Sequence, residues 1–212
     1  MKATFKLKLL LLLAAGMLYS CSNDSGQADT GSGEQTQEVS LKEIPVSLKK
    51  LNIGSQIILF SYTNVSEAQQ LVDAAVADLI VDSKEDLGER TDATQMLTNV
   101  KISGGKAYVN EFLFYDENKQ ELVEGFYYDA ATDSYKPHSA PSLQFMSAAI
   151  NGARCPSGYE QLASCSNFNN PENCIGGALQ SYLSTSLSSV GDCLDIHISV
   201  GLSKTRVCGK EC

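Results

Sequence analysis

The sequence predicts an α+β protein in which a helix packs on an antiparallel meander and a small disulfide-stapled α+β module follows. Three observations predict this class. Apolar residues recur at helical spacing over 66–82, strand-like runs with turn signals fill 97–135, and six cysteines crowd the last 58 residues. The predicted organisation is a signal peptide at 1–20, a lipidated flexible tether at 21–40, an α+β domain at 41–140 and a cysteine-rich disulfide-stapled module at 141–212.

The first domain should combine a short strand with a long helix. Ser55 to Thr63 is apolar and rich in β-branched and aromatic residues, which predicts a buried strand. The helix predicted over 66–82 begins with Ser66 and Gln69 in the pattern of a capping box. Its apolar stripe consists of Ala68, Leu71, Val72, Ala75, Val76, Leu79 and Ile80.

The segment 97–135 has the pattern of a meander. Gly104-Gly105 separates two strand-like runs, as in a tight hairpin turn, and polar residues at 116–120 and 130–133 mark the next turns. Seven aromatic residues lie along these runs: Phe112, Phe114, Tyr115, Phe126, Tyr127, Tyr128 and Tyr135. We expect most of them to fill the core against the helix. Tyr115, Tyr127 and Tyr128 are the candidate binding residues, because an exposed tyrosine can stack on a sugar ring.

The C-terminal segment predicts a helix and then a hairpin. Apolar residues keep helical spacing from Pro171 to about Ser188, and proline suits a first helical turn. Residues 193–202 alternate strictly, which predicts a half-buried strand. The turn after it, Gly201 to Lys204, should lead into a second strand through Cys208.

The first 20 residues have the layout of a signal peptide. Lys2, Lys6 and Lys8 precede an apolar run from Leu9 to Leu18. That run is shorter than the roughly 20 apolar residues that a membrane-spanning helix needs. Cys21 follows directly.

The residues around this cysteine, Leu18-Tyr19-Ser20-Cys21, resemble a bacterial lipobox, and the polar run after them resembles the start of Bacteroidota-type lipoproteins. The resemblance implies that Cys21 carries lipid and becomes the mature N-terminus. It also implies an outer-membrane location, facing the periplasm or the cell surface, since Ser22 rather than Asp follows the cysteine. The alternative is an ordinary secretory signal that leaves Cys21 as a spare thiol.

The segment from Ser22 to Ser40 is nearly all small, polar or acidic, so it cannot bury enough surface to fold. We expect a flexible tether that holds the folded part on the order of 25 Å from the anchor. Removing residues 1–20 takes away three lysines and no acid, so the net charge falls from −9 to −12. Such a charge repels nucleic acid and anionic lipid. The expected partners are therefore the membrane, through the lipid anchor alone, and an envelope protein or a glycan.

The six clustered cysteines predict three disulfides, because their number is even and an exported chain meets an oxidising compartment. They are Cys155, Cys165, Cys174, Cys193, Cys208 and Cys212, and fifteen pairings are open at this point. No CxxC pair occurs and the chain holds two histidines, so we predict neither a metal site nor a cofactor. The acidic turn at 116–121 lacks the glycine and the spacing of an EF-hand, which leaves calcium there as a minor alternative.

The two histidines invite a catalytic interpretation that their surroundings do not support. Asp195, His197 and Ser199 share the polar side of one predicted strand, but same-side neighbours lie ~6.5–7 Å apart, too far for the hydrogen bonds of a catalytic triad. We expect a solvated strand face instead. His138 lies in a Pro-bounded loop near the expected domain junction. We therefore assign no catalytic residue.

The sequence carries no phosphate-binding glycine loop, no GxSxG nucleophile elbow and no HExxH zinc motif. The leading hypothesis is a non-enzymatic, outer-membrane-anchored lipoprotein with a binding or interaction role. One alternative is an exported hydrolase that uses His197 with a partner from elsewhere in the fold. Another is a structural or assembly partner of an envelope complex. A hydrolase would place His197 in a concave site, whereas an assembly partner would present a large flat surface.

Overall fold

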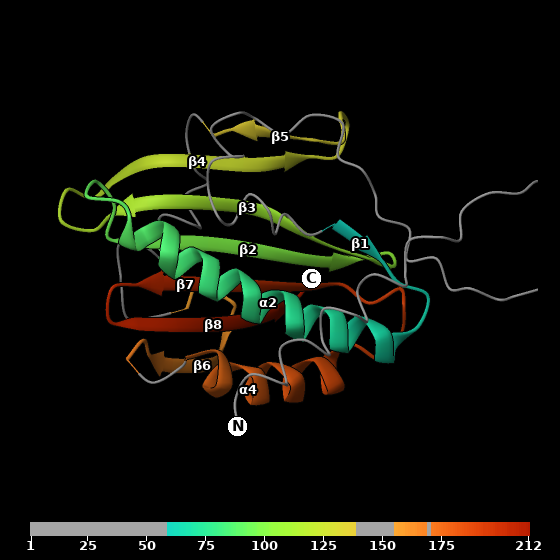
Figure 1. Ribbon diagram of the computed structural model, residues 1–212. Coiled ribbons are helices and arrows are strands. Elements are labelled where there is room, and N and C mark those ends of the chain that lie inside the picture. Colours follow the sequence, from blue (N-terminus) through green and yellow to red (C-terminus); the bar gives the residue numbers. More distant parts are fainter. Residues whose placement is uncertain (1–58, 139–154, 169–170) are drawn as a thin grey trace, which may run out of the picture. The chain divides into compact units, whose positions relative to one another are not determined.

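The computed structural model describes residues 59–138, 155–168 and 171–212. These residues form an antiparallel sheet of eight strands with two helices packed on it (Figure 1), so the predicted α+β class is confirmed. The predicted signal peptide, Cys21 and the tether lie outside the described residues.

The elements follow one another as β1 (Leu59–Ser61), α2 (Val65–Gly88), β2 (Gln95–Ser103), β3 (Lys106–Asp116), β4 (Glu121–Asp129), β5 (Ser134–Pro137), β6 (Glu160–Ser166), α4 (Pro171–Ser186), β7 (Leu194–Gly201) and β8 (Lys204–Glu211). The strand order across the sheet is β5-β4-β3-β2-β7-β8-β6. Strand β1 pairs with residues 106–108 at the start of β3, which β4 does not reach. Among the described residues, neither helix is long and apolar enough to cross a membrane.

Helix α2 begins one residue before the predicted start and continues to Gly88. Its N-cap is Asn64, whose Oδ1 accepts a hydrogen bond from the Glu67 amide at 2.8 Å while its Nδ2 donates to the Glu67 carboxylate at 3.1 Å. The capping box predicted at Ser66 and Gln69 is therefore wrong by two residues, because Asn64 already satisfies the first free amides of the helix. The predicted apolar stripe is buried at Ala68, Val72, Val76, Leu79 and Ile80.

The predicted meander is present as β2 to β5. Gly104 and Gly105 have φ angles of 59° and 76°, the left-handed pair that a two-residue hairpin turn requires and that glycine adopts without strain. Phe112, Phe114 and Phe126 lie in the core, as expected for this aromatic set. The short strand β6 was not predicted, because its polar sequence shows no alternation.

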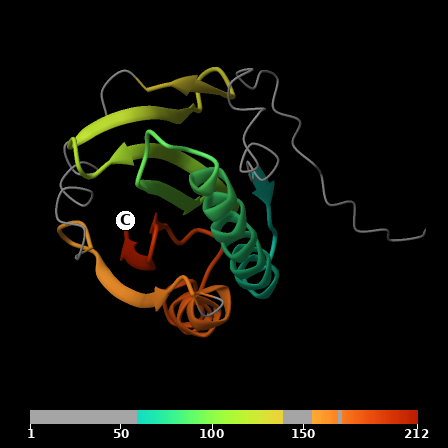
Figure 2. The same ribbon diagram turned by 60° about the vertical axis from the view of Figure 1, so that its left-hand side comes forward.

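The sheet continues across the domain boundary expected near residue 140. β2 pairs with β7 from Gln95↔Gly201 to Ile102↔Leu194. The helices pack against each other, with α2 in green and α4 in orange in Figure 2, and their buried side chains belong to one core. The described parts of 41–140 and 141–212 therefore share a sheet and a core, and the boundary residues themselves lie outside the description.

The predicted disulfides are present and their pairing is resolved. Cys155 bonds to Cys208 across 53 residues, Cys165 to Cys174 across 9, and Cys193 to Cys212 across 19. The second bridge ties the end of β6 to the first turn of α4, and the third joins the start of β7 to the end of β8. All three bridges fasten one half of the sheet.

Candidate functional site

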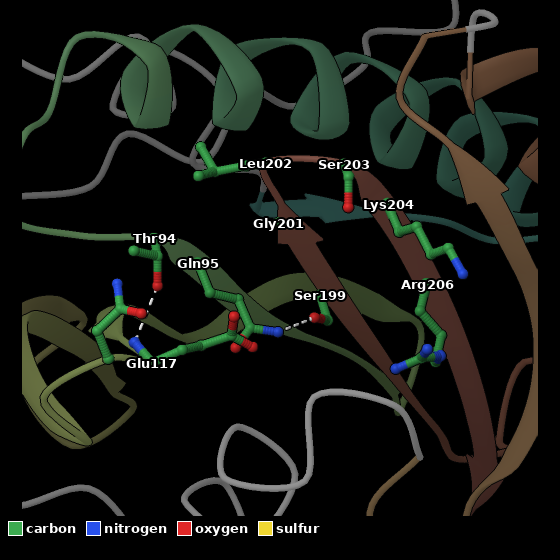
Figure 3. A pocket seen from close by; sticks show the side chains of 10 residues that line it. Thr94, Gln95, Glu117, Ser199, Gly201, Leu202, Ser203, Lys204 and Arg206 are labelled. Atoms are coloured by element: carbon green, nitrogen blue, oxygen red, sulfur yellow. Dashed lines mark hydrogen bonds between the residues drawn. The ribbon is translucent and has the colours of Figure 1, made fainter.

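A polar hollow of about 340 Å³ lies where β2 begins and β7 ends. It is on the sheet face opposite the helices, because the lining residues Gln95 and Ser199 alternate along their strands with Met96 and Val200 of the helix-side core. Its lining residues are Thr94, Gln95, Glu117, Asn118, Ser199, Gly201, Leu202, Ser203, Lys204 and Arg206 (Figure 3). We refer to it as the polar hollow.

The floor of the polar hollow is a buried pair of neutral polar side chains. Nε2 of Gln95 donates to Oγ of Ser199 at 2.5 Å, and Oε1 of Gln95 is buried without a hydrogen-bond partner. Exchanging the two amide atoms would leave the same arrangement, with one atom on Ser199 and the other unsatisfied. A buried polar atom in this state costs about 1–3 kcal/mol. A polar ligand atom at this position would remove that cost.

Charged side chains of opposite sign rise from opposite walls of the hollow. In Figure 3 the side chain of Glu117 extends from the β3–β4 turn toward Gln95, while Arg206 extends from β8 on the other side. Arg206 is the cross-strand neighbour of Ser199, and Lys204 stands at the start of the same strand. The arrangement separates one carboxylate from two cations across a neutral floor.

The wall that carries Glu117 is fixed by hydrogen bonds to the start of β2. The Glu117 amide donates to Oγ1 of Thr94 at 2.8 Å, and the Thr94 amide donates to the carbonyl oxygen of Tyr115 at 2.9 Å. This wall is therefore in place before any ligand arrives, which reduces the entropy that binding must offset.

The opposite wall is fixed by Asn167, just after β6. Its side chain donates to the carbonyl oxygen of Gly201 at 2.5 Å and accepts from Oγ1 of Thr205 at 2.6 Å, and its amide donates to the carbonyl oxygen of Ser203 at 3.0 Å. One asparagine thus holds the whole β7–β8 turn in position. Both walls of the polar hollow are pre-formed.

The acidic turn beside the hollow uses its aspartate for its own structure. Asp116 accepts from the Asn118 amide at 2.9 Å and from the Lys119 ammonium at 3.1 Å, and the bond from Lys119 lowers the pKa of Asp116. Within the described residues, no three side chains of His, Cys, Asp or Glu gather as a metal site would need.

The predicted strand face around His197 is not solvated. His197 is 2% exposed and Ser199 is also buried, so that prediction was wrong for both residues, because both faces of β7 are covered. The rings of Tyr159 and His197 pack edge-to-face with centroids 6.3 Å apart. Burial lowers the pKa of His197 to about 4, and the positive charge of Arg206 acts in the same direction. His197 is thus a buried neutral imidazole, and it does not line the polar hollow.

His138 directly follows β5, and hydrogen bonds fix it beside the sheet. Its amide donates to the carbonyl oxygen of Gly125 at 2.7 Å, and its Nε2 lies 2.5 Å from Oε1 of Glu111. Burial raises the pKa of Glu111, and the neighbouring histidine opposes that shift. The rings of His138 and Tyr127 pack edge-to-face. The His138–Glu111 pair therefore links the residue after β5 to β3 across β4.

The three candidate tyrosines do not form one exposed surface. Tyr115 is 1% exposed and packs with Leu97 and Leu113, whereas Tyr127 is 37% exposed. The Tyr128 hydroxyl donates to Oδ1 of Asp133 at 2.6 Å, and burial raises its pKa to about 12. Tyr127 is therefore the most exposed of these three.

The most exposed large apolar side chains lie on the helix side of the β7–β8 turn. Phe168 is 82% exposed and Leu202 is 67% exposed, and both border a small hollow of about 200 Å³ next to Leu87. The strand predicted over 193–202 ends at Gly201 and leaves Leu202 in the turn.

Sequence reasoning did not find the polar hollow. Its lining residues come from three separate parts of the chain, within 94–95, 117–118 and 199–206, and no spacing pattern connects them. They meet only because β2 pairs with β7 and the two turns end at the same edge. The strand pairing was the missing information.

Comparison of the chain with models of protein families, with curated proteins and with solved structures finds no match.

Proposed function

We propose that this protein is a lipid-anchored envelope protein that binds a small polar ligand in the polar hollow. The leader and the lipobox-like Leu18-Tyr19-Ser20-Cys21 support the lipid anchor and the outer-membrane location, and the three disulfides suit an exported chain. The hollow supports a binding role, since its volume lies at the lower end of the range of small-molecule sites.

The observation that carries the proposal is the buried amide of Gln95. One of its polar atoms is bonded to Ser199 and the other is unsatisfied at the floor of a pre-formed hollow. Folding leaves such an atom unsatisfied only at a cost, and a bound ligand offsets that cost. The Ser199 hydroxyl already accepts from Gln95, and His197 lies outside the hollow. These contacts favour binding over hydrolysis.

The binding role predicts that a small polar compound perturbs the hollow. The mature chain in detergent would be screened by two-dimensional NMR against amino acids, short peptides, sugars, nucleotides and dicarboxylic acids. We expect a binder to shift the amide signals of Gln95, Ser199 and the β7–β8 turn. Gln95→Ala should weaken that binder about tenfold, the loss of roughly one hydrogen bond. Gln180→Ala, on the exposed side of α4, is the matched control and should leave affinity unchanged. A compound that binds both variants equally would contradict the proposed site.

The lipid anchor predicts that Cys21 is acylated. Cells fed radiolabelled palmitate should label the wild-type protein, and Cys21→Ser should lose the label because the thioether to diacylglycerol cannot form. The variant should also leave the membrane fraction, since the remaining chain has no other anchor in the proposal. Cys165→Ser with Cys174→Ser, the pair that closes the shortest loop, is the control for losing cysteines elsewhere, and it should keep the label. Equal labelling of wild type and Cys21→Ser would disprove the anchor.

A further inference from the structure

We infer that the ligand of the polar hollow is a small zwitterion carrying an ammonium group and a carboxylate, as in a free amino acid or a short unblocked peptide. This inference rests on the binding role proposed above and names the class of ligand. It follows from which charges the hollow presents, where they stand and which hydrogen bonds its floor leaves open.

The placement of charge favours a ligand with two poles. Glu117 extends over the floor from the β3–β4 turn, and Arg206 and Lys204 belong to β8 on the opposite side (Figure 3). An ammonium group near Glu117 and a carboxylate near Arg206 would each meet a charge of opposite sign. A guanidinium suits a carboxylate especially well, because its planar fork can donate two parallel hydrogen bonds.

The floor supplies a neutral contact between the two poles. With its amide oriented as in the structure, Gln95 presents a buried carbonyl oxygen that lacks a donor. An ammonium group held by Glu117 carries three N–H donors and can give one to this oxygen. In a peptide, the backbone amide between the two ends offers a further donor. The unsatisfied oxygen of Gln95 thus favours a ligand with a hydrogen-bond donor at this position. Glu117 by itself would favour only a positive charge.

The same lining disfavours the other classes of small polar ligand. A simple anion would be attracted by Arg206 and Lys204 but repelled by Glu117, and a simple cation would face the reverse. A neutral sugar would have to displace water from three charged side chains without supplying a charge in return. Only a compound that bears both charges can form a favourable charge interaction with each wall of the hollow.

The test uses three forms of one dipeptide with the mature chain in detergent: alanylalanine, its N-acetyl derivative and its C-terminal amide. The N-acetyl form lacks the ammonium group and the amide form lacks the carboxylate, while the size of the ligand stays nearly constant. Affinity would be measured by calorimetry, and the site by NMR shifts at Gln95 and Ser199. We expect the free dipeptide to bind at least tenfold more tightly than either blocked form, corresponding to about 1.4 kcal/mol or more.

Three charge-removing variants assign each pole of the ligand to one wall of the hollow. Glu117→Gln should weaken the free dipeptide about tenfold while leaving the N-acetyl form unchanged or better bound, because the variant removes the partner of the missing ammonium. Lys204→Gln and Arg206→Gln should weaken the free dipeptide while leaving the amide form unchanged. The controls make the same chemical changes at exposed sites away from the hollow, Glu85→Gln on α2 and Lys106→Gln at the start of β3, and should have no effect.

The outcomes separate this inference from the broader binding role. If the blocked and free dipeptides bind equally at the hollow, the zwitterion is the wrong class although the binding role stands. If no dipeptide form binds but another compound from the screen shifts Gln95 and Ser199, the inference is overturned and the binding role again stands. If nothing in the screen shifts those residues, both fail. If Glu117→Gln weakens the free dipeptide but does not weaken the N-acetyl form, both the zwitterion and the binding role are supported.

Discussion

Reduction of the three disulfides is expected to unfold the whole described sheet, not only the cysteine-rich segment. The bridges fasten β6, β7, β8 and α4, but β7 is the direct neighbour of β2 at the centre of the sheet. The core is likewise shared, because buried residues of α2, β2 and β3 cluster with those of α4, β7 and β8. If the outer strands separate, β2 loses one of its two partners and the core is opened to water.

The expected size of the effect follows from the loops that the bridges close. Separations of 53, 19 and 9 residues correspond to about 4, 3 and 2.5 kcal/mol in the loop-entropy model. The loops overlap, so the three contributions add incompletely. Their total still approaches the ~5–15 kcal/mol that holds a typical domain together. Full reduction should therefore leave little folded protein at room temperature.

Hydrogen exchange with and without reductant would measure this. We expect amide protection to fall together in β2, β3, β7 and β8 after reduction. Replacing single pairs by alanine should destabilise in the order Cys155–Cys208, then Cys193–Cys212, then Cys165–Cys174, following loop length. Protection that survives in β2 to β4 of the fully reduced chain would mean that residues up to 140 fold independently. Unchanged protection everywhere would mean that the bridges are dispensable.

The sequence predicted the elements better than their arrangement. Periodicity located α2, the meander, α4 and the final hairpin, because each rests on local alternation or helical spacing. Cysteine crowding predicted the bridges, whereas composition could not reveal that β2 pairs with β7. The exposure of His197 was predicted wrongly for a related reason: its alternation with Ile196 and Ile198 is typical of a strand with one solvent-exposed face. Burial of that second face depends on tertiary packing, which the local sequence pattern does not indicate.

The buried His197 predicts a loss of stability in mild acid. Its pKa is about 4 in the folded protein, below the ordinary 6.5 expected in the unfolded chain. Above pH 6.5 the imidazole is neutral in both states and imposes no penalty. As the pH falls from 6.5 to 4, the unfolded chain binds a proton that the folded protein excludes, so unfolding becomes easier. The difference between a pKa of 6.5 and one of about 4 corresponds to roughly 3 kcal/mol of stability, lost by about pH 4.

Denaturant unfolding of wild type and His197→Gln between pH 7 and 4 would isolate this effect. Glutamine keeps a polar side chain at the site but does not titrate, so the variant should lose the acid slope over this range whatever its absolute stability. Glu111 has the opposite effect on stability. Burial raises its pKa, so the folded protein binds this proton more readily than the unfolded chain as the pH falls. Because Glu111 is present in both proteins, its contribution cancels when their stabilities are subtracted.

Gln180→Ala is the matched control, because it changes an exposed side chain on α4 and removes no titrating group. It should keep the acid slope that His197→Gln loses. An NMR titration of the wild-type imidazoles gives a second measurement that does not depend on a variant folding. Identical slopes for wild type and His197→Gln would contradict this prediction, as would an imidazole of His197 that titrates near 6.5. Either result would show that the His197 side chain is exposed to water.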